Sequence, residues 1–389
     1  MIYLDHAATT PVRPEVLEAM LPWFTEHFGN PSSVHHVGLT ASGGVTHARR
    51  ILSDLVGLPP SAVVFTAGGT EADVLALRGV FARPATRPRS LVISAVEHPA
   101  VLETARALAE IGVELRIVGV DAFGRVDPSA ITDAVDATTA LVSIMHVNNE
   151  TGAAQPIGAL SRAVKSKNAR TLVHVDAVQS FGRYPVSFTR WPDVDLVSIA
   201  GHKIYGPKGV GALFVRPGTH LSALLTGGGQ EAGLRSGTHN VPGIVGLAEA
   251  ARLLAATASE DLARYASLAT RFLDGLTARV PDAALNGARD EIAPYDKRAP
   301  YIVNVRIPGA PAEPLLHALE AAGVMASAGS ACHAKDAKLS HVLSAMGLTE
   351  ASGACLRFSF GRATTEAHVD AALDALVAAL PRLKAAARG

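Results

Sequence analysis

Short apolar runs alternate with longer amphipathic stretches through the middle of the chain. The apolar runs have the length of buried strands and lie at 63–66, 91–94, 115–118, 141–145, 172–175, 196–200 and 212–215. Apolar residues at helical spacing fill most of the intervals, at 71–83, 101–111, 128–135 and 157–166. Strands that alternate with helices predict a parallel sheet covered by crossover helices. We therefore predict an α/β fold with a mainly parallel, seven-stranded sheet flanked by helices.

The pattern on either side of this region is different. Further helices and strands are expected at 14–27, 241–256, 301–307, 356–360 and 365–383. His35 and His36 follow a Gly/Pro/Ser-rich segment and are interpreted as loop residues. The mixture of strands and helices after residue 260 predicts a smaller α+β unit.

A chain of 389 residues exceeds what one compact core usually holds, so two domains are expected. The change of pattern suggests a large domain at 15–260. The small domain would then combine residues 1–14 with residues 261–389.

Composition and charge exclude several classes of protein. Hydrophobic residues make up 48% of the chain and charged residues 18%, which is typical of a globular protein. Because 35 basic residues balance 35 acidic ones, no nucleic-acid partner is expected. The first residues lack a signal-peptide pattern, and no apolar run reaches the ~18 residues of a membrane span. We expect a cytoplasmic enzyme with no membrane partner.

A lysine and an aspartate follow two of the predicted strands. Lys203 lies in S-I-A-G-H-K-I-Y-G-P-K-G-V-G, after the strand at 196–200. An exposed loop lysine would also fit this segment, whereas a phosphate-binding P-loop does not, because Pro207 occupies the position of its lysine. Asp176 ends the preceding strand, in T-L-V-H-V-D-A-V-Q-S, and such strand ends share one edge of a sheet. The pair indicates a pyridoxal 5′-phosphate (PLP) site, which needs a Schiff-base lysine and a carboxylate for the pyridine nitrogen.

The two cysteines lie in different settings. Cys332 is surrounded by small and polar residues in M-A-S-A-G-S-A-C-H-A-K-D-A-K-L-S-H, which predicts a thiol on a flexible loop. Cys355 lies in the apolar segment A-C-L-R-F, which predicts a core residue. Two cysteines cannot form a disulfide framework or a CxxC zinc site. No metal site is expected, although Cys332 could ligate an iron–sulfur cluster transiently.

Several motifs identify a family that the chain resembles. D-H-A-A-T-T-P begins at Asp5, H-V-N-N-E-T-G spans 146–152, and G-R-A-T-T-E ends at Glu366. With the lysine and aspartate segments, these motifs make the chain similar to the class V, fold-type I PLP enzymes, specifically the cysteine desulfurases and their selenocysteine lyase relatives. The similarity extends over essentially the whole chain. It implies a large PLP-binding domain and a smaller α+β C-terminal domain.

The resemblance implies a role for each residue of the site. Lys203 would hold PLP and act as general base, Asp176 would pair with the pyridine nitrogen, and His98 would stack on the ring. The remaining contacts to the cofactor are implied for Gly69, Thr70, Asn149, Gln179 and His202, and for Thr238 acting across a homodimer. Arg357, with Asn149, would bind the substrate carboxylate.

The implied reaction converts L-cysteine to L-alanine and leaves a persulfide on Cys332. His98, or His333 beside Cys332, would accept the thiol proton. The sulfur would pass to an acceptor or iron–sulfur scaffold protein, for iron–sulfur clusters, tRNA thiolation or another thio-cofactor. An aminotransferase is disfavoured because transamination needs no loop cysteine. A non-catalytic scaffold is disfavoured because Lys203 and Asp176 are both present.

The chain departs from the desulfurase pattern at a few positions. Ala200 replaces a phosphate-binding serine, Gly69 a common alanine, which is harmless for a turn, and Val74 an asparagine. The string M-A-S-A-G-S-A-C-H is closer to the segment that selenocysteine lyases carry. A selenocysteine lyase that releases selenium and alanine is therefore the alternative function.

Overall fold

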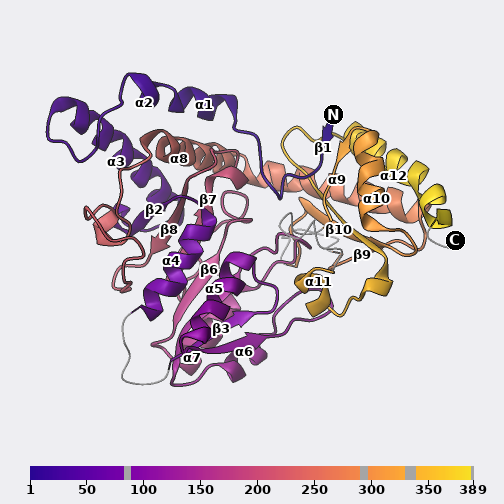
Figure 1. Cartoon of the computed structure of the whole chain (residues 1–389), viewed down its shortest axis with the longest axis horizontal. Coiled ribbons are helices and arrows are strands. Elements are labelled where there is room, and N and C mark those ends of the chain that lie inside the picture. The colour runs from indigo at the N-terminus through magenta and orange to yellow at the C-terminus, as the bar shows by residue number, and fades with distance from the viewer. Residues whose placement is uncertain (83–88, 290–296, 329–338, 387–389) are drawn as a thin grey trace.

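A computed structural model describes residues 1–82, 89–289, 297–328 and 339–386. Its main feature is a seven-stranded sheet (Figure 1), whose strands are, in spatial order, β2 (Val63–Thr66), β8 (Gly211–Val215), β7 (Leu196–Ala200), β6 (Leu172–Asp176), β5 (Thr139–Met145), β3 (Ser90–Ser94) and β4 (Glu114–Val118). Neighbouring strands from β7 to β4 run parallel, whereas β8 runs antiparallel to both β2 and β7. The predicted α/β fold with a mainly parallel, seven-stranded sheet is confirmed.

Helices cover both faces of this sheet, because its central strands are buried on both sides. α4 (Gly69–Phe81) and α5 (Pro99–Glu110) pack on one face, where Leu75, Leu77 and Val101 join the strand residues in one apolar core. The helices on the other face are α3 (His36–Val56), α6 (Pro128–Ala134), α7 (Ile157–Lys167) and α8 (Val241–Ala256).

Helix α3 corrects the interpretation of His35 and His36 as loop residues. His36 opens the helix, and His35 is its N-cap, with Nδ1 accepting the N–H of Gly38 at 3.3 Å. Glycines inside α3 weaken the helical pattern in the sequence. At Gly44 the glycine is required by packing, because a Cβ there would lie 2.3 Å from the ring of Trp23.

The single helix expected at 14–27 is instead two short helices. They are α1 (Pro14–Met20) and α2 (Pro22–Thr25). Pro22 separates them because a proline inside a helix removes a main-chain donor and clashes with the preceding turn.

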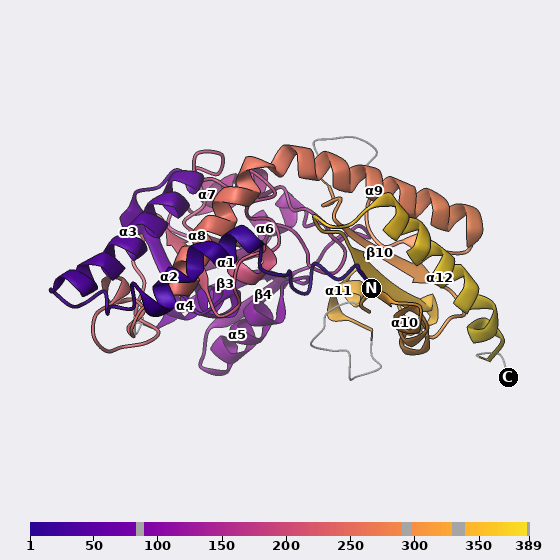
Figure 2. The ribbon, with the colours of Figure 1, turned by 90° about the horizontal axis from the view of Figure 1, so that it is seen from above.

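A second sheet, with three antiparallel strands, follows in the chain. In it β10 (Ile302–Ile307) lies between β12 (Ala354–Ser359) and β9 (Ala284–Leu285). Its apolar core is shared with three helices, α9 (Ala258–Arg279), α10 (Ala312–Ala321) and α12 (Glu366–Ala386). Figure 2 shows α9 running along the top of the molecule from the first sheet towards the second. The domain boundaries given above stay a prediction.

Two small elements complete this part of the molecule. β1 (Ile2–Tyr3) pairs in parallel with β11 (Val324–Met325), and α11 (His341–Ala345) packs near the end of β3. The N-terminal segment therefore lies beside the second sheet (Figure 1). Among the helices that the structure describes, none alone is long and apolar enough to cross a membrane; α8 and α9 pass that test only when joined, and they meet at a bend of 70°.

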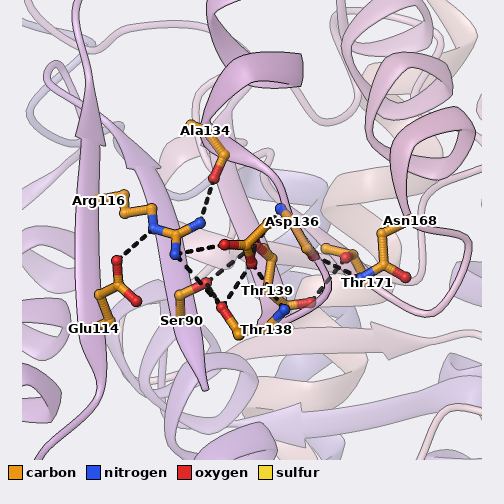
Figure 3. A network of polar contacts seen from close by, with 9 residues as sticks. All are labelled: Ser90, Glu114, Arg116, Ala134, Asp136, Thr138, Thr139, Asn168 and Thr171. Atoms are coloured by element: carbon orange, nitrogen blue, oxygen red, sulfur yellow. Dashed lines mark hydrogen bonds and ion pairs between the residues drawn. The ribbon is translucent and has the colours of Figure 1, made fainter. Parts of the chain in front are cut away.

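A polar network fixes the amino edge of the large sheet (Figure 3). Arg116 on β4 bonds Glu114 and Asp136, each at 2.8 Å, and the carbonyl of Ala134 at 2.9 Å. The Ser90 hydroxyl donates to Thr139 at 3.1 Å and joins β3 to β5. These polar groups bond to one another, whereas folds of this kind bind ligands at the opposite edge, where the parallel strands end.

Candidate active site

A cavity of about 810 Å³ opens at the carboxyl edge of the large sheet. Its lining includes nearly all of the predicted site residues that the structure describes: Gly69, Thr70, His98, Asn149, Asp176, Gln179, His202, Lys203 and Arg357. A second cavity, of about 850 Å³, is lined by other residues, among them Arg125, His146 and Trp191. Size does not distinguish the two cavities, so the chemistry of the lining selects the first.

Lys203 ends a short 3-10 helix, Gly201–Lys203, that follows β7. Its Nζ donates to the carbonyls of Ala7 and Ala8, at 2.6 and 2.8 Å. Burial, followed by the charge of Arg357, lowers the pKa of Lys203 from 10.5 to about 8. A substantial share of the amine is therefore neutral near physiological pH, as a nucleophilic lysine requires.

Asp176 is the last residue of β6 and lies on the cavity wall. Its Oδ1 accepts the N–H of Val178 at 2.9 Å. Burial raises the pKa of Asp176 to about 6, while the Val178 hydrogen bond and the charge of Lys203 act in the opposite direction. Lys203 and Asp176 thus line one cavity, as their places at successive strand ends predict.

Arg357, on β12, connects the two sheets at the cavity. Its side chain is almost fully buried, with Nη2 2.7 Å from Oδ1 of Asp5 and Nη1 2.8 Å from the carbonyl of Asn149. Nε is buried without a hydrogen-bond partner among the described residues. The arginine predicted to bind the substrate carboxylate therefore already carries a carboxylate partner, Asp5.

His98 is the N-cap of α5, and its Nδ1 accepts the N–H of Ala100 at 3.1 Å. Burial, followed by the charges of Lys203 and His341, lowers the pKa of His98 to about 4. The ring is then neutral at physiological pH, and its proton is on Nε2 because Nδ1 is an acceptor. The structure presents His98 as a neutral hydrogen-bond donor.

The amino end of α4 opens into the cavity. Gly69 and Thr70 form its first turn, and no side chain caps it. Main-chain N–H groups at such an end bind phosphate well. His202 lies beside it, with Nδ1 3.2 Å from the Thr9 hydroxyl, and burial lowers the pKa of His202 to about 4.

The departures at Gly69 and Ala200 occur in the same small space. A Cβ on Gly69 would lie 2.7 Å from Cγ2 of Val178 and 3.4 Å from Cβ of Ala200. The absence of a side chain at Gly69 therefore leaves the space that the Val178 side chain occupies. The exchange of alanine for glycine is harmless for the turn, as expected from the sequence, and it also has this consequence for packing. Nothing in the structure explains Val74.

The amides of Gln179 and Asn149 differ in their engagement. Gln179 donates from Nε2 to the carbonyl of Ala7 at 2.8 Å, and the main-chain carbonyl of Gln179 accepts the Tyr301 hydroxyl at 2.8 Å. Asn149 uses its main-chain carbonyl for Arg357, while its side chain lines the cavity. Both residues hold the N-terminal segment or the second sheet against the site.

The predicted site also includes Thr238, Cys332 and His333. Thr238 is exposed and does not line the cavity. Cys332 and His333 lie outside the described residues. The expectation that Cys355 is a core residue is confirmed, since its side chain is buried on β12.

Residues that the sequence did not single out also shape the site. Asp5 pairs with Arg357, and Arg183 donates to the carbonyl of Lys203 at 3.0 Å while stacking over Tyr301. Glu97 is fully buried next to His98, and burial raises its pKa to about 8. Asp5 begins the motif D-H-A-A-T-T-P and Glu97 directly precedes His98, so their positions in the sequence offer a usable signal.

The comparisons agree with this geometry. The aminotransferase class V family model matches residues 2–372. A protein named cysteine desulfurase IscS 1, from Archaeoglobus fulgidus, is 41% identical over 99% of this chain and 98% of its own length. A cysteine desulfurase from Gluconacetobacter diazotrophicus is 42% identical over 98% of this chain and 94% of its own. The names of these relatives favour a desulfurase over the selenocysteine lyase alternative.

Solved structures give the same result. A NifS-like protein superposes with a TM-score of 0.90 at 36% identity, over 98% of this chain and 100% of that one. A structure described as SspA in complex with cysteine has a TM-score of 0.80 at 33% identity, over 92% and 99%. The chain belongs to the class V aminotransferase family, and this membership implies PLP as its cofactor.

Proposed function

We propose that the chain is a PLP-dependent cysteine desulfurase. The observation that carries the proposal is the convergence of Lys203, Asp176 and Arg357 on one cavity, with a lysine pKa of about 8. A Schiff-base lysine, a carboxylate for the pyridine nitrogen and an arginine for an amino acid's carboxylate are together what PLP chemistry on an amino acid requires.

The described residues fit PLP as a resident cofactor. Lys203 would hold it covalently, Asp176 would keep its pyridine nitrogen protonated, and the open first turn of α4 at Thr70 would take the phosphate. Gly69 supports this fit, because the position has no room for a Cβ. Asn149, Gln179, His202 and His98 complete the lining.

Different side chains would carry out different steps of the reaction. When bound, PLP supplies an electron sink conjugated to the substrate's amino group. Arg357 binds the substrate carboxylate as a planar fork, and Lys203, once free, removes the Cα proton as general base. Because Arg357 is paired with Asp5, the incoming carboxylate competes with or joins a carboxylate already present.

Cys332 would carry the sulfur away. Its thiolate attacks the substrate's sulfur, so an S–S bond forms as the Cβ–S bond breaks and its electron pair remains on carbon. The carbon skeleton takes up a proton and leaves as alanine, and the thiol proton is lost to a nearby base. L-Cysteine and one thiol thus give L-alanine and one persulfide, with no external reductant. His98, neutral with its Nδ1 occupied, would have to release Ala100 to serve as that base.

We propose a homodimer as the working form, with Thr238 reaching the partner's cofactor phosphate. Thr238 is exposed and outside its own chain's cavity, which supports this role. Large apolar side chains are also exposed along the N-terminal helices and the loops between them: Leu17, Leu21, Phe24, Phe28, Val34 and Leu39. A second copy of the chain packed against these helices would cover them. The persulfide would then pass to a separate sulfur-acceptor or iron–sulfur scaffold protein.

The test is a single-turnover reaction of the PLP-loaded protein with L-cysteine. We expect one alanine per active site and one added sulfur on Cys332, seen by mass spectrometry. Lys203→Ala should form neither product and should give no borohydride-trapped adduct. Release of alanine from L-selenocysteine but not from L-cysteine would replace the proposal with the lyase, and release from neither would overturn it.

A further inference from the structure

A row of polar side chains crosses the centre of the large sheet beneath α4. Ser143 on β5, His174 on β6 and Ser198 on β7 are fully buried, and Asp73 of α4, 1% exposed, lies over them. Ser143 and His174 are direct partners in the β5–β6 ladder. Polar groups in such an interior are costly unless they bond to one another, so their protonation states are constrained.

The histidine is satisfied by the two serines. His174 Nδ1 lies 2.8 Å from the Ser143 hydroxyl and Nε2 lies 2.9 Å from the Ser198 hydroxyl. Asp73 is farther away, with Oδ1 3.6 Å from His174 Nε2. Burial lowers the pKa of His174 to about 3, so a neutral ring is favoured.

Asp73 has poor support for a negative charge. Its Oδ1 is buried without a hydrogen-bond partner among the described residues. The Ser198 hydroxyl faces its carboxyl group, but burial and then the charge of Asp176 raise the pKa of Asp73 well above its usual range. A carboxyl group in this setting is stabilised by carrying a proton.

Asp176 is better placed than Asp73 to carry a negative charge. It lies opposite Ser198 in the β6–β7 ladder, so it borders the same cluster. Unlike Asp73, it accepts a main-chain N–H, from Val178 at 2.9 Å, and the charge of Lys203 favours its ionised form. Two buried carboxyl groups this close cannot both ionise readily, so the proton is expected on Asp73.

We propose that Asp73 is a neutral carboxylic acid that acts as a positioning residue for Asp176. Asp73 donates to the Ser198 hydroxyl, which donates to His174 Nε2, and His174 Nδ1–H donates to Ser143. The cluster then carries no net charge, and the negative charge presented to the pyridine nitrogen is confined to Asp176. The inference rests on the proposed function only where it gives the charge on Asp176 a purpose. The protonation state of Asp73 is a property of the protein without PLP.

Other titratable groups face this cluster and must be accounted for. Glu97 is fully buried and is also expected to hold a proton at neutral pH, because burial raises its pKa to about 8. Lys203 and His98 line the cavity of the candidate active site. Arg183 and Arg357 contribute positive charge beside that cavity. Of the three buried carboxyl groups, Asp176 alone is expected to be ionised at neutral pH.

The test is difference infrared spectroscopy of the apo-protein at pH 7, in H₂O and D₂O. Protonated carboxyl groups have a carbonyl band that shifts on deuteration. We expect Asp73→Asn and Glu97→Gln each to remove one such band and Asp176→Asn to remove none. Loss of a band in Asp176→Asn, or no loss in Asp73→Asn, would overturn the proposal. So would a wild-type spectrum without a carboxylic acid band, which requires no variant to fold.

A second readout uses the PLP-loaded protein. Asn replaces a neutral acid by a neutral amide in Asp73→Asn, so the pH midpoint of the visible absorption band should move by less than about 0.3 unit. Removal of a real negative charge at this position would move it by about one unit or more. A large shift would overturn the proposal. Failure of the desulfurase proposal would instead leave the infrared bands intact while alanine and persulfide are absent.

Discussion

Replacing Arg357 by methionine tests how the site lowers the pKa of Lys203. A pKa of about 8 instead of 10.5 makes the neutral amine about 300-fold more abundant at pH 7. Arg357 contributes to this shift through its positive charge, whereas Asp5 opposes it. Arg357→Met removes the cation and also leaves Asp5 without its partner at 2.7 Å, so both effects raise the lysine pKa.

We expect a rise of about one unit, which lowers the neutral fraction of Lys203 at pH 7 about tenfold. Asp5→Asn is the matched control of opposite sign, because it removes the anion and leaves Arg357 unpaired. The assay is the rate at which the apo-protein captures PLP, measured by absorbance from pH 6.5 to about 10. Only the neutral amine attacks an aldehyde, so the rate should rise with pH through about 8 in the wild type.

The midpoint should move up in Arg357→Met and down in Asp5→Asn. PLP titrates identically in all three experiments, so the differences report on Lys203. A wild-type midpoint near 10.5, or shifts of the same sign in both variants, would refute the electrostatic account of this lysine.

Three further results are expected. Cys332→Ser should keep PLP but lose alanine release from L-cysteine, while Cys355→Ser, a change in the core, should retain it; equal activity in both would remove Cys332 from the reaction. Phe28→Asp should weaken the dimer in light scattering, because Phe28 is 70% exposed, and an unchanged dimer would place the interface elsewhere. Gly69→Ala should weaken PLP retention about 5- to 100-fold, because the added Cβ clashes with Val178. Adding Val178→Ala to this variant should restore retention, and a failure to do so would show that Val178 is not the cause of the loss.

Much of the fold follows from the apolar pattern of the sequence. The strands of the large sheet are short apolar runs, mostly buried apart from β4 at the edge, so each predicted strand lies within two residues of its observed bounds. Parallel strands then bring Asp176 and Lys203 to one edge without further information. The pattern fails at α3, where glycines interrupt the helical signal and Gly44 leaves room for Trp23, and at Pro22, which divides one expected helix into two.

The finer structure of the site depends on contacts that no local pattern records. Arg357 and Asp5 are 352 positions apart, and Lys203 meets the carbonyls of Ala7 and Ala8 across nearly 200. In the sequence, Asp73 is an ordinary polar residue of a predicted helix. Only the burial of its carboxyl group in α4 shows that it faces the sheet. Such roles come from three-dimensional packing rather than from spacing.

The contact of Lys203 with the first residues of the chain also determines when the site can exist during synthesis. Lys203 is made nearly two hundred residues after Ala7 and Ala8, and Arg357 is made 352 residues after its partner Asp5. A nascent chain that lacks β12 has a large sheet but no finished cavity. The cavity is therefore complete only once β12 has been made, because only then can Arg357 pair with Asp5.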